Sequence, residues 1–317
     1  MKLYTNKTFL TCFLAFLLCI SLTGCGDNPG TDSPNTNTNN SETTTTKGSR
    51  DNTSIVLVPE ASGTSVESCD SATIDTSNAA EGYIMADYHG TNEKVKLQIK
   101  GPDGVTYSYN LHGGGYEVFP LTAGNGTYSI GVYENISGTK YSTALSCSVD
   151  VTITNEFGPY LYPNQYVNFT ASSLPVGKAV DLAYTANNDL EVVENVYNYM
   201  IRNFTYDYDK AENVQSGYLP VIDEVYKANT GICFDYAAVM ATMLRTQNIP
   251  TRLEVGYVGE EYHAWISTYI QDIGWVNGII EFDGSDWNLL DPTFASTSKS
   301  PTDFITEDSK YLTKYVY

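Results

Sequence analysis

Three residues in the C-terminal half of the chain carry side chains that together could perform acyl transfer: the thiol of Cys233, the imidazole of His263 and the carboxylate of Asp291. A thiolate attacks a carbonyl carbon, an imidazole moves the proton, and a carboxylate holds the imidazole in one tautomer. The three residues follow one another at intervals of 30 and 28 positions. An isolated cysteine in an alanine-rich helix is usually a packing residue, so the hypothesis depends on all three occurring together.

The elements around these residues are predicted to bring them to one edge of a sheet. Cys233 follows a glycine-containing loop and opens an apolar helix, which ends near Asn248 and Pro250. Three strands are expected after this helix, at residues 251–258, 262–269 and 287–290. His263 begins the second strand and Asp291 follows the third, so the nucleophile comes from a helix end, the imidazole from one strand and the carboxylate from the next.

The position of Cys233 at a helix N-terminus predicts a reactive thiol. Unpaired backbone N–H groups and the helix dipole stabilise negative charge there. A protonated imidazole nearby would add to this effect. We therefore expect a pKa below that of an ordinary cysteine.

At these residues the chain resembles the transglutaminase-like superfamily, within the papain-like fold group. The matching pieces are Gly231-x-Cys233-x-Asp235-Tyr236-Ala237, Leu244-Arg245, Ile249-Pro250 with Arg252 and Gly256-Tyr257, His263-Ala264-Trp265, and Leu290-Asp291-Pro292-Thr293. The resemblance covers about residues 175–300. It implies that Cys233 is the nucleophile, His263 the general base and later acid, and Asp291 the carboxylate that orients the imidazole. It also implies an oxyanion hole built from the backbone N–H of the nucleophile and a second donor, for which the upstream tyrosines are candidates.

The fold class expected from these patterns is α+β, with an all-β immunoglobulin-like sandwich preceding a papain-like, transglutaminase-like core of N-terminal helices packed on an antiparallel sheet. Short alternating segments at residues 82–88, 94–100, 127–133 and 143–154 predict the sandwich strands. An apolar stripe behind Asn188 and Glu191 predicts the first helix of the second domain. The expected division is a signal peptide at 1–24, a disordered stalk at 25–54, the sandwich at 55–170 and the catalytic domain at 171–317.

The first 25 residues predict export and membrane anchoring. Lys2 and Lys7 precede an apolar run at residues 9–20, which is typical of a signal peptide and too short for a mature membrane span. The following Leu22-Thr23-Gly24-Cys25 resembles the lipobox of bacterial lipoproteins, which implies that Cys25 carries lipid and anchors an exported protein to the cell membrane. The alternative is an ordinary signal peptide with an incidental cysteine.

Composition limits the possible partners. The formal net charge of −20 argues against nucleic-acid binding, which depends on Lys and Arg. No His or Cys pair has the spacing of a metal site, and we expect no cofactor. Cys69 and Cys147 could form a disulfide in an exported protein or could each be a buried apolar residue.

Two hypotheses of function remain. The first is a cysteine peptidase, amidase or acyltransferase that acts on a peptide or protein substrate. Hydrolysis ranks above crosslinking, because no feature marks a lysine-acceptor site. The second is a surface module that has lost activity and only binds peptide or glycan.

Overall fold

The computed structural model describes residues 45–282, 287–289 and 311–317. The N-terminal part holds two four-stranded sheets, and every pairing between their strands is antiparallel. The first sheet has the order β1-β2-β3-β6 and consists of β1 (Val66–Ser68), β2 (Ala72–Asp75), β3 (Tyr83–Tyr88) and β6 (Glu117–Pro120). The second has the order β5-β4-β7-β8 and consists of β4 (Val95–Lys100), β5 (Thr106–Leu111), β7 (Gly126–Ser137) and β8 (Lys140–Val151). Two short 3-10 helices, η1 (Ala79–Glu81) and η2 (Gly158–Tyr160), lie outside the sheets.

Alternating burial explains why the sequence pattern located these strands. Along β8, Leu145, Cys147 and Val149 are at least partly buried, whereas the residues between them are exposed. Apolar residues from both sheets belong to one core. The four predicted sandwich strands are confirmed as β3, β4, β7 and β8, while the finer immunoglobulin-like designation stays a prediction.

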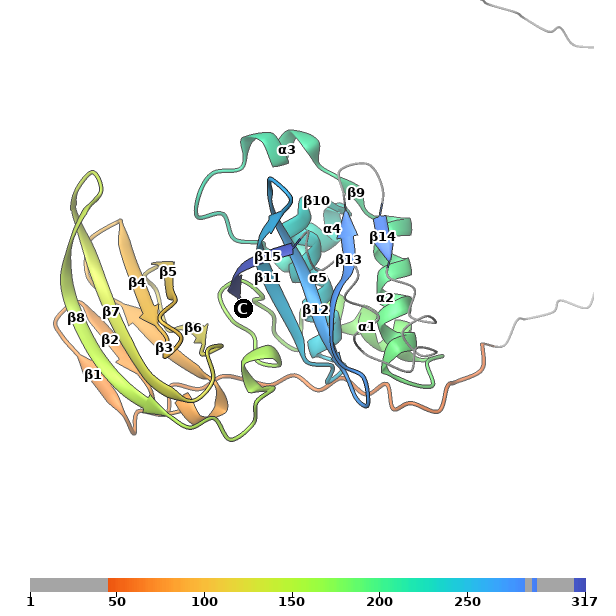
Figure 1. Ribbon diagram of the computed structural model, residues 1–317, viewed down its shortest axis with the longest axis horizontal. Helices are drawn as coiled ribbons and strands as arrows, with labels where there is room; N and C mark the ends of the chain where they lie inside the picture. Colours follow the sequence, from red (N-terminus) through yellow and green to blue (C-terminus); the bar gives the residue numbers. More distant parts are fainter. Residues whose placement is uncertain (1–44, 283–286, 290–310) are drawn as a thin grey trace, which may run out of the picture. The chain divides into compact units, whose positions relative to one another are not determined.

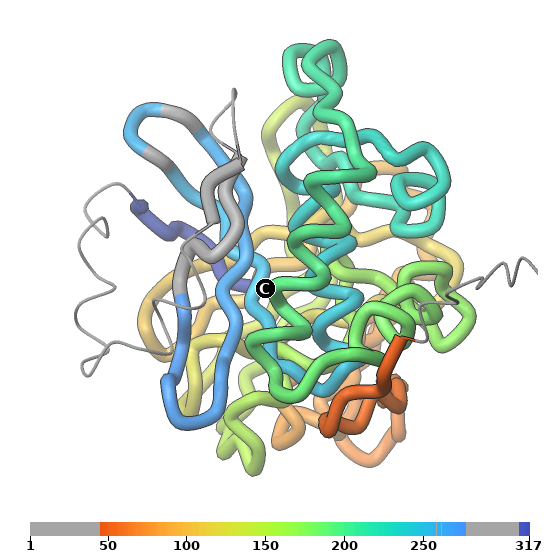
Figure 2. The backbone as a smooth tube through the Cα atoms, turned by 90° about the vertical axis from the view of Figure 1, so that its right-hand side faces the viewer, coloured from red at the N-terminus to blue at the C-terminus, as the bar shows by residue number. Residues whose placement is uncertain are grey.

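The C-terminal part combines helices with a five-stranded antiparallel sheet of order β14-β13-β12-β11-β15. The helices are α1 (Leu174–Ala183), α2 (Asp189–Asn203), α3 (Tyr208–Asn213), α4 (Ile222–Ala228) and α5 (Cys233–Arg245). The strands of the sheet are β11 (Thr251–Val258), β12 (Glu261–Ile270), β13 (Gly274–Phe282), β14 (Trp287–Leu289) and β15 (Tyr311–Val316). Helices α1, α2 and α5 lie on one side of the sheet (Figures 1 and 2). This arrangement confirms the expected α+β class with helices packed on an antiparallel sheet.

Two strands of this sheet were not expected. The sequence predicted that the strand before Asp291 would directly follow the strand of His263, but β13 lies between β12 and β14. Strand β15 pairs with the opposite edge of β11. The prediction of adjacent strands was wrong because residues 274–282 form an additional strand that no periodic pattern had marked.

The predicted disordered stalk requires a correction at its end. Residues 45–54 lie within the described chain and bond to the helices. The Arg50 guanidinium donates to a carboxylate oxygen of Asp189 at 2.6 Å and to the backbone oxygen of Gln247 at 2.6 Å. The backbone N–H of Gly48 donates to Tyr184. The prediction of disorder was based on the scarcity of apolar residues in this segment. The structure shows that hydrogen bonds and an ion pair hold its end in place.

The sandwich and the helical part belong to one compact unit. The side chain of Thr122 donates to the backbone oxygen of Val316 at 3.1 Å, and the ring of Tyr107 contacts that of Tyr317 edge-on at 5.7 Å. These contacts join the sandwich to β15. The boundary placed at residue 170 therefore stays a prediction. Among the described residues, no helix has both the length and the apolar character needed to cross a bilayer.

Helix α5 is the central element of the helical part. Eleven of its 13 residues are buried, and it contacts α1, α2, α4, β11 and β12. At its C-terminal end the fully buried guanidinium of Arg245 donates to the backbone oxygens of Thr251, Tyr162 and Tyr317, at 3.0, 2.7 and 2.9 Å. One side chain thus connects α5 to β11, to the segment before α1 and to the residue that follows β15.

Replacing Arg245 by Met should lower the free energy of unfolding by about 2–4 kcal/mol, because buried carbonyl groups would lose their donors. The measurement is urea denaturation followed by circular dichroism. Arg202→Met provides the control, since Arg202 is exposed in the last turn of α2 and should change stability by less than about 1 kcal/mol. Equal losses in the two variants would contradict the proposed role of Arg245.

Candidate active site

Cys233 is the first residue of α5, and the two residues before it have the conformation and contacts that start the helix there. Ile232 has an extended conformation and donates its N–H to the Asp235 carboxylate at 2.9 Å, which satisfies one of the unpaired donors at the helix start. A Cβ atom on Gly231 would lie 2.6 Å from the Asp235 Cβ and 2.8 Å from its carboxylate. The motif Gly231-x-Cys233-x-Asp235 therefore has a steric reason, since only glycine lets this carboxylate approach the turn.

Asp235 also holds residues 210–218 in place, and part of this segment lines the cavity beside Cys233. Its side chain is fully buried and accepts hydrogen bonds from the Lys210 ammonium at 2.6 Å and from the Tyr218 hydroxyl at 2.5 Å. Lys210 in turn donates to the Tyr218 oxygen at 2.7 Å and lies over the Tyr218 ring. A buried carboxylate needs such partners. Asp235 belongs to the sequence motif, but the sequence alone indicates no role for it, because Lys210 and Tyr218 are distant from it in the chain.

The thiol of Cys233 lies against the strand that carries His263. The backbone N–H groups of Phe234 and Ala264 lie near enough to the sulfur to favour its thiolate form, and Ala264 directly follows His263 on β12. The hydroxyl of Tyr206 contacts both the thiol and the backbone N–H of Cys233. Tyr206 belongs to the short strand β9 (Thr205–Tyr206), which pairs in parallel with β10 (Thr230–Gly231). This pairing brings the tyrosine next to the start of α5.

Burial raises the pKa of the Cys233 thiol above its ordinary value, because the charged thiolate loses hydration. The N–H groups of Ala264 and Phe234 and the hydroxyl of Tyr206 act in the opposite direction. The net shift is upward, so the expected lowering of the pKa is wrong: desolvation outweighs the donors at the helix N-terminus. Burial also raises the pKa of Tyr206 to about 12, which keeps its hydroxyl protonated and able to donate.

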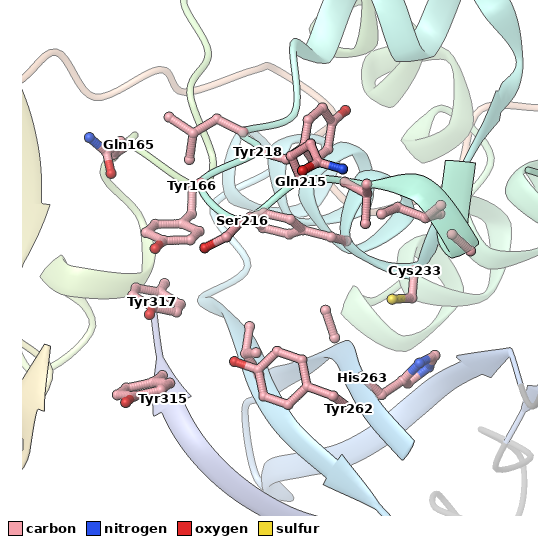
Figure 3. Close-up of a pocket in the computed structure, with 18 of the residues that line it drawn as sticks. Gln165, Tyr166, Gln215, Ser216, Tyr218, Cys233, Tyr262, His263, Tyr315 and Tyr317 are labelled. Carbon is pink, nitrogen blue, oxygen red and sulfur yellow. The ribbon is translucent and has the colours of Figure 1, made fainter. Parts of the chain in front are cut away.

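Cys233 and His263 line the same cavity, whose volume is about 520 Å³. Figure 3 shows Cys233 above β12 and the side chains of Tyr262 and His263 directed to different sides of that strand. The structure thus brings together two of the three predicted catalytic residues. Asp291 lies outside the described residues, as does Cys25, so their roles stay predictions.

Cys69, Cys147 and Cys233 are all free thiols, so the possible disulfide between Cys69 and Cys147 is not formed. Within residues 45–282, 287–289 and 311–317, no group of His, Cys, Asp and Glu side chains is arranged to hold a metal ion. The described residues bring to the site a thiol, an imidazole, a phenol and backbone N–H groups.

Tyr206→Phe should raise the pKa of Cys233 further, because it removes a donor that stabilises the thiolate. At a fixed pH near 8 the variant should then react more slowly with iodoacetamide, and its labelling profile should move to higher pH. The measurement is peptide-resolved mass spectrometry, which separates Cys233 from the free Cys69 and Cys147. Tyr184→Phe, at an exposed tyrosine, should leave the profile unchanged. An unchanged profile in Tyr206→Phe would show that its hydroxyl does not stabilise the thiolate.

Part of the chain is similar to known proteins. The family model of the transglutaminase-like superfamily matches residues 178–278. UPF0252 protein MJ1282 of Methanocaldococcus jannaschii is 29% identical over 92 residues, which cover 25% of this chain and 26% of that relative. Uncharacterized protein YebA of Bacillus subtilis is 27% identical over 157 residues, which cover 42% of this chain and 19% of that relative. The chain thus spans about a quarter or less of the length of either relative.

Two solved structures also align with the chain. The periplasmic domain of TgpA from Pseudomonas aeruginosa bound to ethylmercury is 13% identical with a TM-score of 0.32, covering 75% of this chain and 78% of that one. Red sea bream transglutaminase is 15% identical with a TM-score of 0.24, covering 69% of this chain and 50% of that one. Residues 178–278, the helix-and-sheet segment that carries the cysteine and histidine motifs, thus match the transglutaminase-like superfamily.

Proposed function

We propose that this chain is a cysteine hydrolase that cleaves amide bonds of peptide or protein substrates through a thioester on Cys233. The observation that carries the proposal is that Cys233, at the start of α5, and His263, on β12, line the same cavity. A core cysteine with only a packing role needs neither a cavity nor a neighbouring imidazole. The alternative of an inactive binding module has no separate observation in its favour.

The raised pKa of Cys233 affects how the first step would proceed. The resting thiol is largely protonated at neutral pH, so His263 takes its proton as the sulfur attacks the carbonyl carbon. The C–N bond then breaks, and the protonated imidazole gives the proton to the departing amine. A thioester remains. Water attacks it with His263 again as base, the C–S bond breaks, and the thiol is regenerated as the carboxylic acid leaves.

The negative charge that develops on the carbonyl oxygen needs donors. The backbone N–H of Cys233 is one, as the family resemblance implies. The Tyr206 hydroxyl touches this N–H group and stays protonated, which supports it as the second donor. One donor of this kind commonly contributes a factor of about 10²–10³ to kcat. The resemblance of Leu290-Asp291-Pro292-Thr293 to the family motif implies that Asp291 orients His263.

The catalytic proposal predicts strongly non-additive losses. Cys233→Ala and His263→Ala should each abolish nearly all turnover, and the double variant should be no slower, since the groups act as a unit. Asp291→Ala should leave about a hundredfold more activity than either, by analogy with serine triads. Release of amine from fluorogenic peptides measures this, and Cys147→Ala, at a free thiol in the sandwich, is the matched control. Full activity of Cys233→Ala would refute the mechanism.

We further propose that the protein is exported and held at the cell membrane by lipid on Cys25. The lipobox-like Leu22-Thr23-Gly24-Cys25 supports this location, and two acyl chains give stable anchoring.

Cys25→Ser should therefore release the protein into the medium or leave an uncleaved precursor. Membrane fractionation and immunoblotting measure both outcomes, with Cys69→Ser as a control that should stay in the membrane fraction. Retention of Cys25→Ser with normal processing would rule out the anchor.

A further inference from the structure

The cavity beside Cys233 has an unusual lining for so acidic a chain. Its walls come from β5, from the segment before α1, from residues 214–219, from the start of α5 and from strands β11, β12 and β15. Among the described residues that line it there is no Asp, Glu, Lys or Arg, although the whole chain has a formal net charge of −20. A charged group entering this cavity would lose hydration without meeting an opposite charge on the described walls.

Aromatic rings dominate the part of the cavity away from the thiol. Tyr166 and Tyr317 stack with ring centroids 4.0 Å apart, and Phe234 contacts Tyr166 at 5.4 Å. Tyr262 is 60% exposed at the edge of the cavity. Figure 3 shows Tyr166, Tyr315 and Tyr317 on the side of the cavity remote from Cys233, with Tyr262 between them and Cys233. Such surfaces bind a flat ring by stacking and edge-on contact.

The remaining lining groups are amides and hydroxyls, including Ser108 and Asn110 from the sandwich. Gly217, with a φ of 90°, approaches the Asn110 side chain so closely that a Cβ atom would lie 2.3 Å from its nitrogen. The hydrogen bond that the Tyr218 hydroxyl donates to the Asp235 carboxylate also holds this segment. Contacts at two neighbouring residues, Gly217 and Tyr218, therefore hold this wall of the cavity in place before a substrate arrives.

We propose that this cavity binds an uncharged peptide segment bearing an aromatic side chain, next to the amide that Cys233 attacks, and that it rejects acidic and basic side chains. The inference rests on the proposed function for the position of the amide. A peptide fits the observations better than a glycan, because it supplies both an amide for the thiol and a ring for the tyrosines. Because Ser108 and Asn110 belong to β5, the sandwich contributes directly to substrate choice.

The test measures binding without turnover, in the full chain carrying Cys233→Ala. Three dye-labelled peptides that differ only in a central Tyr, Asp or Lys are titrated by fluorescence anisotropy. The Tyr peptide should bind at least about tenfold more tightly than either charged peptide. Tyr262→Ala in the same background should weaken the Tyr peptide about tenfold, whereas Tyr184→Ala, at an exposed tyrosine outside the cavity, should not. Circular dichroism checks that each variant is folded.

A second variant tests whether the lack of charged residues on the described walls excludes charged peptides. Ser108→Lys places a cation on the sandwich wall and should improve binding of the Asp peptide severalfold while weakening the Lys peptide. Equal affinities for the three peptides, no binding of any of them, or tighter binding of a neutral oligosaccharide that displaces the Tyr peptide would each overturn the inference.

Turnover by the wild type separates this inference from the proposed function. If the wild type cleaves all three peptides equally well, the specificity inference fails and the hydrolase proposal stands. If the Tyr peptide binds selectively but no peptide is cleaved, the hydrolase proposal fails while the cavity retains its selectivity.

Discussion

The close packing of α5 against helices on one side and strands β11 and β12 on the other is the constraint on which the rest of the site depends. Ala237, Ala238 and Ala241 are all buried, and their small side chains let neighbouring backbones approach. The Arg245 guanidinium fixes one end of the helix and the Asp235 carboxylate fixes the other. Because a helix packed in this way has little freedom to shift, the first residue, Cys233, has a defined position relative to β12. The packing that stabilises the core thus also fixes the position of the nucleophile.

The same burial sets the chemistry of the thiol. Removing Cys233 from water raises its pKa, and three donors only partly compensate. A protonated resting thiol is less open to oxidation and adventitious alkylation than a thiolate, since the thiolate is the reactive form. The proposed mechanism then needs a base at the moment of attack. The absence of Lys and Arg from the described lining belongs to the same pattern, because the negative charge on the carbonyl oxygen would then be stabilised by the Cys233 N–H and the Tyr206 hydroxyl.

Local sequence signals predicted the elements with the strongest periodicity. Asn188 does cap α2, accepting the N–H of Glu191 at 3.0 Å, and Asn248 has the left-handed conformation expected after α5, with a φ of 56°. Strands β11 and β12 also occur where alternation placed them. Long-range relations could not be derived in this way: the pairing of β15 with β11 and the bond between Lys210 and Asp235 join segments with no shared local pattern. The upward pKa shift of Cys233 was missed for the same reason, since burial depends on the whole fold.

In the proposed mechanism, the Cys233 sulfur forms a covalent bond with the acyl group of an amide substrate. The most direct measurement is mass spectrometry of the wild-type protein after brief incubation with an amide library and quenching in acid, which preserves thioesters. An acyl adduct should appear on the peptide that contains Cys233, should be absent from the peptides that contain Cys69 and Cys147, and should be removed by hydroxylamine. Hydrolysis of an amide by the purified protein with no adduct on Cys233 at any quench time, together with unchanged turnover after Cys233 is alkylated, would contradict it.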